Sequence, residues 1–402
     1  MTTVIELSPT TIAHGGEAVA RVDGKTHFVA GAMPGERVLA EVVRDKGSWA
    51  RAELREVLEA SPDRIDPPCG HFAECGGCTW QFAAYPAQLE WKRSIVAGQL
   101  EHLGGLPDPV VRPTAAPGPP YGYRNRMDFR VADGSPALLR RRSRDPVLIE
   151  ECLLLHPALD AVFGRLGGLG SAEAITLRVG TATGEALAVV DGPIPAGAPG
   201  WGCSVARRSP PREIIGPGAI HEEVAGMRFR ITGDAFFQTN TAAAEVLAAL
   251  VVEALEVQED DVLLDAYAGG GLFGLVAGKG AARVIAVESG DLALGDLDHN
   301  AAASGIDVEI LEGRAETVLG ETTEDWDVAV VDPPRKGLGD PGVGAVTSTA
   351  PRAIAYVSCD PASLGRDARL LAAHGYRLDW AAPVDLFPQT FHVETVAAFR
   401  RA

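Results

Sequence analysis

Residues 353–361 read Ala-Ile-Ala-Tyr-Val-Ser-Cys-Asp-Pro, an apolar run that changes abruptly to a thiol, an acid and a proline. The apolar residues predict a buried strand, and Asp360 and Pro361 end it. In an open α/β sheet the ligand crevice lies at the carboxyl ends of the strands. Cys359 is therefore a candidate nucleophile. The alternative is a buried structural thiol, which this stretch alone favours because free cysteines are among the most buried residues.

Three earlier segments are also apolar runs that predict buried strands, and each ends in an acidic residue. They are residues 262–265, 283–288 and 326–332. A predicted helix at 241–256 precedes them, and a glycine-rich loop at 268–274 follows the first. Alternating strands and helices of this kind predict an α/β fold with a doubly wound, mainly parallel, Rossmann-like sheet.

The acids and the loop at 268–274 indicate a cofactor site. A glycine-rich loop alone is weak evidence and is also found in NAD-binding proteins, but the spacing here does not follow the dinucleotide pattern. Glu288 is placed to accept both hydroxyls of a ribose. An acid at a strand end can instead cap the next helix, but three in register with a glycine loop favour a cofactor. With Asp332-Pro333-Pro334, these features resemble the class I S-adenosylmethionine methyltransferases.

A cysteine beside a methyl donor has a chemical use if the methyl acceptor is carbon. C5 of uridine is a poor nucleophile, but thiolate addition at C6 makes an enolate whose C5 can attack the sulfonium methyl group. A base must then remove the C5 proton before the thiolate leaves. His392 and Glu394 lie on one face of a predicted strand, and either is a candidate base. The alternative for Glu394 is a surface carboxylate.

A second group of cysteines lies upstream. Cys69, Cys75 and Cys78 lie close together around Gly76-Gly77, and Cys152 is the candidate for a fourth ligand. Thiolate clusters bind zinc or an iron–sulfur centre, and the spacing does not separate the two. His71 is an alternative zinc ligand.

The N-terminal half of the chain predicts smaller units. Closely spaced strands in residues 4–58 predict a small, OB-like β-barrel of the oligonucleotide-binding kind, followed by a proline-rich linker. Residues 85–103 predict a helix. Residues 121–130 alternate aromatic and basic side chains along a predicted strand, which suits stacked RNA bases. A half-exposed amphipathic strand would look similar.

The net charge of −18 over 402 residues argues against a general nucleic-acid binder. Seven arginines between positions 124 and 144 nevertheless allow a local basic patch, or equally a solvated hairpin. The sequence has no apolar run of membrane-spanning length and does not begin like a signal peptide, so we expect a cytoplasmic protein.

Together these motifs resemble the RNA 5-methyluridine methyltransferases that carry an N-terminal TRAM domain. The resemblance covers essentially the whole chain. Besides the four clustered cysteines it rests on residues 14–21, 34–38, 123–126, 236–240, 332–335, 358–361 and 392–395.

The resemblance implies a role for each candidate residue. Cys359 would be the nucleophile and Glu394 the base. S-adenosyl-L-methionine would contact Gln238, Tyr267, Glu288 and Asp332. A [4Fe-4S] cluster would be held by Cys69, Cys75, Cys78 and Cys152. The domains would be a TRAM domain at 1–60, a central α+β, cluster-bearing and RNA-binding domain at 61–232, and a catalytic domain at 233–402.

The resemblance also implies a structured RNA substrate and an enzyme that acts as a monomer, away from membranes. It favours 23S ribosomal RNA, because the transfer-RNA enzymes of the family commonly lack both the TRAM and the cluster-binding domain. Transfer RNA is the alternative within the enzymes. From a different class, the alternative is a catalytically silent RNA-binding protein, against which the pair of Cys359 and Glu394 argues.

Overall fold

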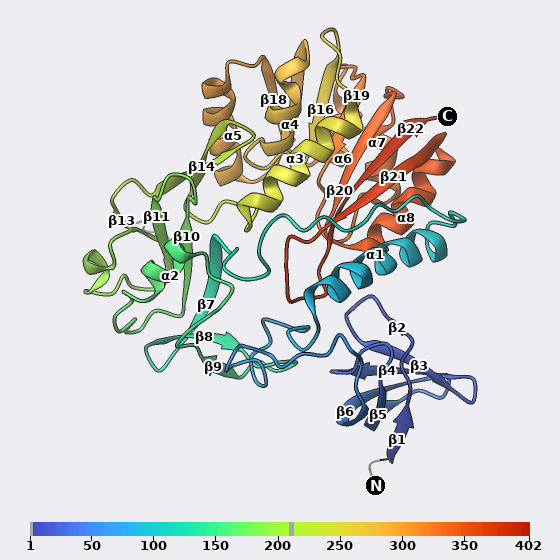
Figure 1. Cartoon of the computed structure of the whole chain (residues 1–402). Helices are drawn as coiled ribbons and strands as arrows, with labels where there is room; N and C mark the ends of the chain where they lie inside the picture. Colours follow the sequence, from blue (N-terminus) through green and yellow to red (C-terminus); the bar gives the residue numbers. More distant parts are fainter. Residues whose placement is uncertain (1–2, 209–212) are drawn as a thin grey trace.

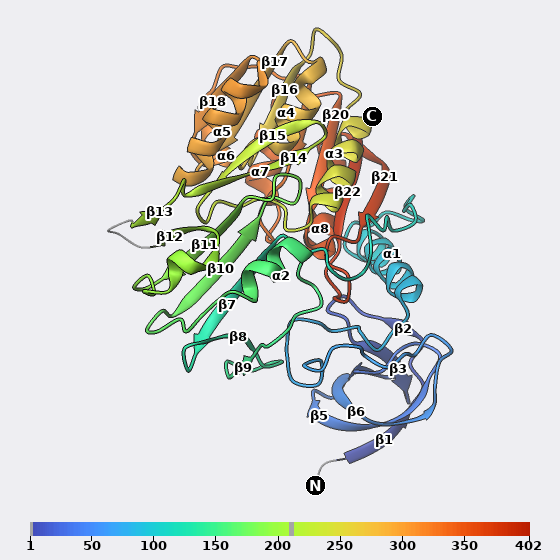
Figure 2. The ribbon, with the colours of Figure 1, turned by 60° about the vertical axis from the view of Figure 1, so that its left-hand side comes forward.

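The computed structural model describes residues 3–208 and 213–402. Within these residues the strands form a six-stranded sheet, two seven-stranded sheets and a two-stranded ribbon. In Figures 1 and 2 the first sheet (blue) lies at the bottom and the last (gold to red) at the top. The second (green) lies beside the space between them.

The C-terminal sheet has the order β18-β17-β16-β19-β20-β22-β21. Its strands are β16 (Val262–Ala266), β17 (Arg283–Glu288), β18 (Val308–Glu312), β19 (Val328–Val331), β20 (Ala353–Ser358), β21 (Tyr376–Val384) and β22 (Glu394–Arg401). All run parallel except β22, which is antiparallel to both neighbours. This arrangement confirms the predicted doubly wound sheet.

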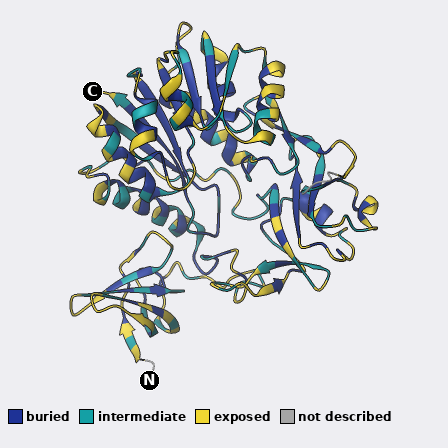
Figure 3. Cartoon of the chain, turned by 180° about the vertical axis from the view of Figure 1, so that it is seen from behind, coloured by how far each residue is buried: buried dark blue, intermediate teal, exposed yellow. Residues whose placement is uncertain are grey.

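Helices cover both faces of this sheet, so its strands are dark blue between partly yellow helices in Figure 3. The helices are α3 (Thr241–Leu255), α4 (Leu272–Ala277), α5 (Asp291–Ser304), α6 (Ala315–Glu321), α7 (Gly339–Val346) and α8 (Pro361–Ala373). Helices α3 and α4 share one apolar core with the sheet, and α6, α7 and α8 share the core on the other face. The β-branched, alanine-rich strands are buried on both faces, as parallel strands require.

Helix α1 (Tyr85–His102) confirms the helix predicted at 85–103. Its Val96 and Leu100 lie in the same apolar core as Tyr356 of β20. The chain that follows continues this contact, because Val111 and Ala115 form bridges to β21. Helix α1 and the chain that follows it, which the domain boundaries expected from the sequence assign to the central domain, thus pack on the C-terminal sheet.

The N-terminal sheet has the order β1-β5-β6-β4-β3-β2. Its strands are β1 (Thr3–Leu7), β2 (Thr11–Ile12), β3 (Ala18–Val22), β4 (Lys25–Ala30), β5 (Arg37–Asp45) and β6 (Trp49–Glu59). Small side chains such as Ala18, Ala20 and Ala40 are buried in its core. The predicted small β unit is present, while its identity as an OB-like barrel stays a prediction.

The central sheet has the order β13-β12-β11-β10-β7-β8-β9, and α2 (Pro157–Phe163) packs on it. Its strands are β7 (Arg126–Ala132), β8 (Ser135–Leu139), β9 (Pro146–Leu148), β10 (Ala174–Val179), β11 (Ala186–Asp191), β12 (Ser204–Arg207) and β13 (Ile214–Ile215). The ribbon of β14 (Ala219–Val224) and β15 (Met227–Thr232) joins the core on the α3 side of the C-terminal sheet.

The predicted strand at 121–130 is only half correct, because β7 begins at Arg126. Tyr123 and Asn125 lie in the preceding loop and are buried. No helix in the described parts of the chain is long and apolar enough to cross a membrane.

Candidate active site

A cavity of about 1150 Å³ opens where the parallel strands of the C-terminal sheet end. It is lined by all six residues predicted from the sequence to act in catalysis or to bind the methyl donor. These are Gln238, Tyr267, Glu288, Asp332, Cys359 and Glu394. The structure therefore brings together side chains from six separate segments, at the edge of the sheet where ligands of α/β proteins bind.

Cys359 and Glu394 meet through the pairing of β20 with β22. Ser358 is the last paired residue of β20 and lies opposite Thr395. The printed pairing ends there, and Cys359 and Glu394 are the next residues along the two segments, close enough for the charge of Glu394 to act on the Cys359 thiol. Asp360 then caps α8 by accepting a hydrogen bond from the Ser363 N–H at 2.8 Å. This turn from strand to helix leaves the thiol at the cavity edge.

Glu394 has the electrostatics of a general base, and His392 does not. Burial and the charge of Asp332 raise the pKa of Glu394 to about 8. Burial and the charge of Arg335 lower the pKa of His392 to about 4. A base works best when its pKa lies near the working pH. His392 also lies outside β22, which begins at Glu394, so the predicted shared strand face is wrong.

Asp332 lines the cavity, and the buried Asp265 lies near it without lining the cavity. Burial raises the pKa of both Asp265 and Asp332 to about 7, and each also lies near a further acid. Burial, then Glu394 and Asp332, raise the pKa of Cys359 to about 12. A bound cation lowers the pKa of neighbouring acids and thiols. The acids of this cavity therefore fit a positively charged ligand such as a sulfonium.

The glycine-rich loop holds the acids at the strand ends in place. The Gly274 N–H donates to Asp265 at 2.8 Å, and a Cβ at this glycine would lie only 2.5 Å from the carboxylate. The Gly269 N–H donates to Oε2 of Glu288 at 2.8 Å, and Ser289 and Gly290 donate to its Oε1. A carboxylate accepts about four hydrogen bonds, so Oε2 keeps the open acceptor site for a ribose hydroxyl.

Tyr267 has a strained backbone at the end of β16. Its φ of 67° lies in the left-handed region, which bulky residues rarely adopt. Its hydroxyl makes no hydrogen bond within the described part of the chain. Strain of this kind concentrates at ligand sites, and an unpaired hydroxyl at the cavity wall suits a ligand contact.

The central sheet positions Gln238. The Asn125 side chain donates to the Gln238 carbonyl at 3.1 Å, and its N–H donates to the Thr239 carbonyl at 3.0 Å. Arg178 of β10 donates to the Ala235 carbonyl at 2.6 Å. Asn125 thus holds the segment around Gln238 at the cavity wall, and the prediction of a strand is wrong at this residue, because β7 begins at Arg126.

Tyr123 is likewise not available to stack on RNA. It is buried, and its hydroxyl donates to the Pro388 carbonyl at 3.0 Å. Of the seven arginines that allowed a basic patch or a solvated hairpin, three form ion pairs in the described residues: Arg126 with Asp234 at 2.8 Å, Arg140 with Glu74 at 2.8 Å and Arg142 with Glu17 at 2.6 Å.

Further residues line the cavity without having been assigned a role from the sequence. They include Arg124, Phe236, Arg335 and Phe387. The sequence contained a local signal that Arg335 lies at the site, because Arg335 directly follows Asp332-Pro333-Pro334. Phe387 had none, because it lies in an irregular loop between β21 and β22.

The four clustered cysteines line a second cavity of about 240 Å³. Burial raises the pKa of the Cys78 thiol to about 12 and also raises that of Cys75 and Cys152. In the described residues no three His, Cys, Asp or Glu side chains lie close enough to hold one metal ion. Thiolates are ligands of both zinc and iron–sulfur centres, and the lining of this cavity does not separate the two. His71 lines the same cavity.

Comparison with known proteins agrees with this geometry. Residues 220–401 match the family model described as tRNA (uracil-5-)-methyltransferase. An uncharacterised RNA methyltransferase of Gloeobacter violaceus is 35% identical over 98% of this chain and 95% of its own length. One from Streptomyces avermitilis is 34% identical, over 99% of this chain and 98% of its own.

A solved structure is similar over the full chain. It is the Pyrococcus abyssi tRNA (uracil-54, C5)-methyltransferase in complex with S-adenosyl-L-homocysteine, with 26% sequence identity and a TM-score of 0.78. The likeness covers 98% of this chain and 99% of that one. The α/β fold is therefore that of a methyltransferase.

Proposed function

This chain belongs to the tRNA (uracil-5-)-methyltransferase family and is an S-adenosylmethionine-dependent RNA methyltransferase, and we propose that it methylates C5 of a uridine in structured RNA. The observation that carries the proposal is the register of β20 and β22, which sets Cys359 against Glu394 at the cavity edge. A nucleophile and a base facing each other are what carbon methylation through a covalent adduct requires. A silent RNA-binding protein would have no use for this pair.

The proposed reaction divides one difficult step into three. The Cys359 thiolate adds to C6 of uracil, and the ring electrons move to form an enolate. C5 then attacks the methyl carbon of the donor, and S-adenosylhomocysteine leaves with the bonding electron pair. Glu394 finally takes the C5 proton, the C6–S bond breaks, and the thiolate is released.

We assign donor binding to Gln238, Tyr267, Glu288 and Asp332. Glu288 would accept a ribose hydroxyl, and Asp332 would lie near the positive end of the ligand. The charge of a bound sulfonium lowers the pKa of Cys359 and Glu394. Donor binding therefore favours the thiolate and the carboxylate, which are the forms that the two residues need.

The test has two variants. Cys359→Ala should abolish methyl transfer to RNA while donor binding is retained, and Cys203→Ala, directly before β12 of the central sheet, is the matched control. Glu394→Gln should form the adduct but fail to resolve it, so protein linked to RNA accumulates on a denaturing gel. Turnover by Cys359→Ala, or no adduct with Glu394→Gln, would contradict the mechanism.

We propose that Cys69, Cys75, Cys78 and Cys152 hold a [4Fe-4S] cluster. Their convergence on one cavity supports a thiolate-bound metal group, and the resemblance to the iron–sulfur members of the family favours the cluster over zinc. When bound, a cluster would tie the cysteine segment to the chain around Cys152. We also propose that residues 1–60 form a TRAM-type RNA-binding barrel, that 61–232 carry the cluster, and that 233–402 catalyse the reaction.

The target RNA has two candidates. 23S ribosomal RNA follows from the presence of the N-terminal sheet and the cysteine segment. Transfer RNA is favoured by the Pyrococcus abyssi enzyme, whose likeness extends over 98% of this chain, so the extra segments do not separate the two classes. Mapping 5-methyluridine in both RNAs, from cells with and without the gene, decides between them.

A further inference from the structure

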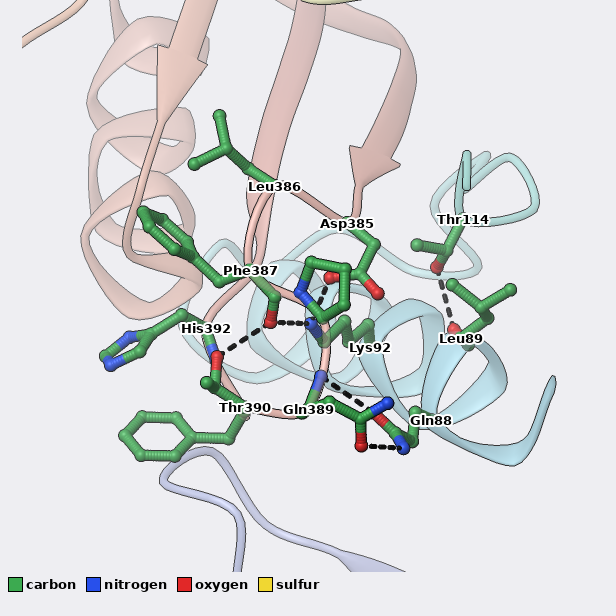
Figure 4. A network of polar contacts seen from close by, with 12 residues as sticks. Gln88, Leu89, Lys92, Thr114, Asp385, Leu386, Phe387, Gln389, Thr390 and His392 are labelled. Atoms are coloured by element: carbon green, nitrogen blue, oxygen red, sulfur yellow. Dashed lines mark hydrogen bonds and ion pairs between the residues drawn. The ribbon is translucent and has the colours of Figure 1, made fainter. Parts of the chain in front are cut away.

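Lys92 of α1 is a charged residue in the apolar interior. Its side chain is 0% exposed, as is that of Asp385, and its Nζ lies 2.5 Å from Oδ1 of this acid. The same ammonium donates to the Phe387 carbonyl at 3.1 Å (Figure 4). Burying two charges is expensive unless they are paired and hydrogen-bonded. A pair kept at this cost points to a role beyond packing.

The pair lies at the start of the loop that leads into the candidate base. Asp385 follows the last residue of β21, and β22 begins at Glu394, which pairs with Val384. The loop between them brings Phe387 to the cavity wall. Lys92 therefore fixes the first and third residues of the connection whose end carries Glu394.

The middle of this loop is also fixed by α1. Gln88 lies one turn before Lys92, so both are on one face of the helix. Its Nε2 donates to Oε1 of Gln389 at 3.0 Å, and its Oε1 accepts from the Gln389 N–H at 3.1 Å (Figure 4). The Gln389 carbonyl accepts from the N–H groups of Thr79 and Trp80, next to the cysteine segment. The loop is thus held along its length by α1, and of the two α1 side chains described here Lys92 is the charged one.

The positive charge of Lys92 also acts on the carboxyl group of Glu394. The charged groups that act on the Glu394 carboxyl are Asp332, which raises its pKa, and Arg335 and Lys92, which both lower it. The Cys359 thiol is coupled to the same carboxyl. Arg335 is exposed at the cavity mouth, whereas Lys92 acts from inside the protein.

We propose that Lys92 is a positioning residue for Glu394: its ammonium group, buried against Asp385 and the Phe387 carbonyl, fixes the base and favours its ionised form for removal of the C5 proton. This inference rests on the proposed function, because it assigns Lys92 to the step in which Glu394 resolves the adduct.

The test is Lys92→Met, which keeps the length of the side chain and removes its charge. Turnover should fall by about tenfold to a hundredfold, less than the hundredfold to ten-thousandfold that a general base itself typically contributes, while the affinity for S-adenosylmethionine stays within about threefold. RNA–protein adduct should accumulate, and the rise of turnover with pH should move to higher pH. The shift has this direction because loss of a nearby cation raises the pKa of a carboxyl.

A second variant covers the case in which a lone buried Asp385 prevents folding. Lys92→Met with Asp385→Leu removes both charges, and replacing a buried pair by apolar residues is often tolerated. It should fold, yet still accumulate adduct and show the alkaline shift. Wild-type turnover and pH profile in this double variant would overturn the proposal.

The matched control breaks an ion pair at the opposite edge of the sheet. Arg352 precedes β20 and pairs with Asp261, which precedes β16, at 2.5 Å. Arg352→Met should lower the melting temperature without adduct and without a shifted pH profile. If it behaves like Lys92→Met, the effect is general destabilisation and the proposal fails.

The two proposals fail differently. If Glu394→Gln gives no adduct, the assignment of the base is wrong whatever Lys92 does. If Glu394→Gln gives adduct and Lys92→Met resolves it at the wild-type rate, only the role of Lys92 is lost.

Discussion

His14 of the N-terminal sheet lies against Asp360, the residue that directly follows Cys359, with 3.4 Å between Nε2 and Oδ2. Two residues along the same turn, the Gly16 carbonyl accepts a hydrogen bond from Trp80 at 3.0 Å. Gly16 also packs on Phe391 in the loop before Glu394. The turn at residues 14–16, which belongs to one of the stretches that carry the family resemblance, therefore joins the N-terminal sheet to the candidate active site.

This contact predicts a large effect of a single methyl group. A Cβ at Gly16 would lie 2.8 Å from Cβ of Phe391, closer than such atoms approach. Gly16→Ala should therefore push the turn away from the loop that precedes Glu394. We expect turnover on RNA to fall at least tenfold, measured as the rate of methyl incorporation at saturating substrate.

Gly15 provides the control for backbone strain. Its φ of 105° is also in the region that disfavours other residues, but no atom lies within 4 Å of a Cβ built on it. Gly15→Ala should lose about 1 to 3 kcal/mol of stability, the typical cost of a non-glycine residue in a disfavoured backbone conformation, and keep its turnover. Equal losses of turnover in the two variants would show that strain, and not the contact with Phe391, matters.

The buried acids predict how donor binding depends on pH. Asp332 and Glu394, with pKa values raised to about 7 and about 8, are partly protonated at neutral pH in the free protein. A sulfonium binds their ionised forms better. The affinity for S-adenosylmethionine should therefore rise as the pH increases from 6 to 8 (roughly the range of these shifted pKa values), with proton release on binding.

S-adenosylhomocysteine tests whether this pH dependence comes from the charge of the ligand and not from its shape, because its sulfur is neutral. Its affinity should change much less over the same pH range, and its binding should release fewer protons. Titration calorimetry in two buffers with different ionisation enthalpies measures both quantities. Identical pH profiles for the two ligands would contradict an electrostatic role for these acids.

The buried pair predicts the stability of the variants as well as their chemistry. Removal of Lys92 alone leaves Asp385 buried and uncompensated, so Lys92→Met should lose about 3 to 5 kcal/mol of unfolding free energy. The double variant with Asp385→Leu should recover most of it. Urea unfolding of the wild type, both single variants and the double variant gives the coupling energy. Additive losses would mean that the two charges do not interact.

The sequence predicted those parts of the site that have a local signature. Cys359, Asp332 and Glu288 each end an apolar strand, and parallel strands bring their carboxyl ends to one edge of a sheet. The register between β20 and β22 could not be predicted in the same way. It depends on β22 entering the sheet antiparallel between β20 and β21, which tertiary packing decides.

The residues whose roles the sequence did not reveal were missed for one physical reason. Lys92 is spaced like an ordinary residue of an amphipathic helix, and its role appears only when Asp385, far along the chain, is folded against it. Tyr123 and Asn125 look like an RNA-binding surface, because aromatic and polar side chains also suit a buried contact between sheets. Local pattern does not distinguish a solvent-facing polar group from one whose partner is distant.

The cysteine cavity leads to a prediction about metal content. Cys152 lies far along the chain from the other three cysteines and is brought to them by folding. Protein purified without oxygen should be brown and contain about four iron atoms per chain. Cys152→Ser should lose the colour and the iron, whereas Cys203→Ser, outside this cavity, should keep both.

Loss of the metal should also affect the loop at residues 385–393, which precedes Glu394. Thr79 directly follows Cys78, and its N–H donates to the Gln389 carbonyl at 2.9 Å. Disorder in the cysteine segment would thus loosen the loop before Glu394, so Cys152→Ser should lower turnover and increase proteolysis between positions 385 and 393. A colourless wild-type protein with about one zinc ion per chain would contradict the cluster. Full turnover without iron would contradict the link to the loop.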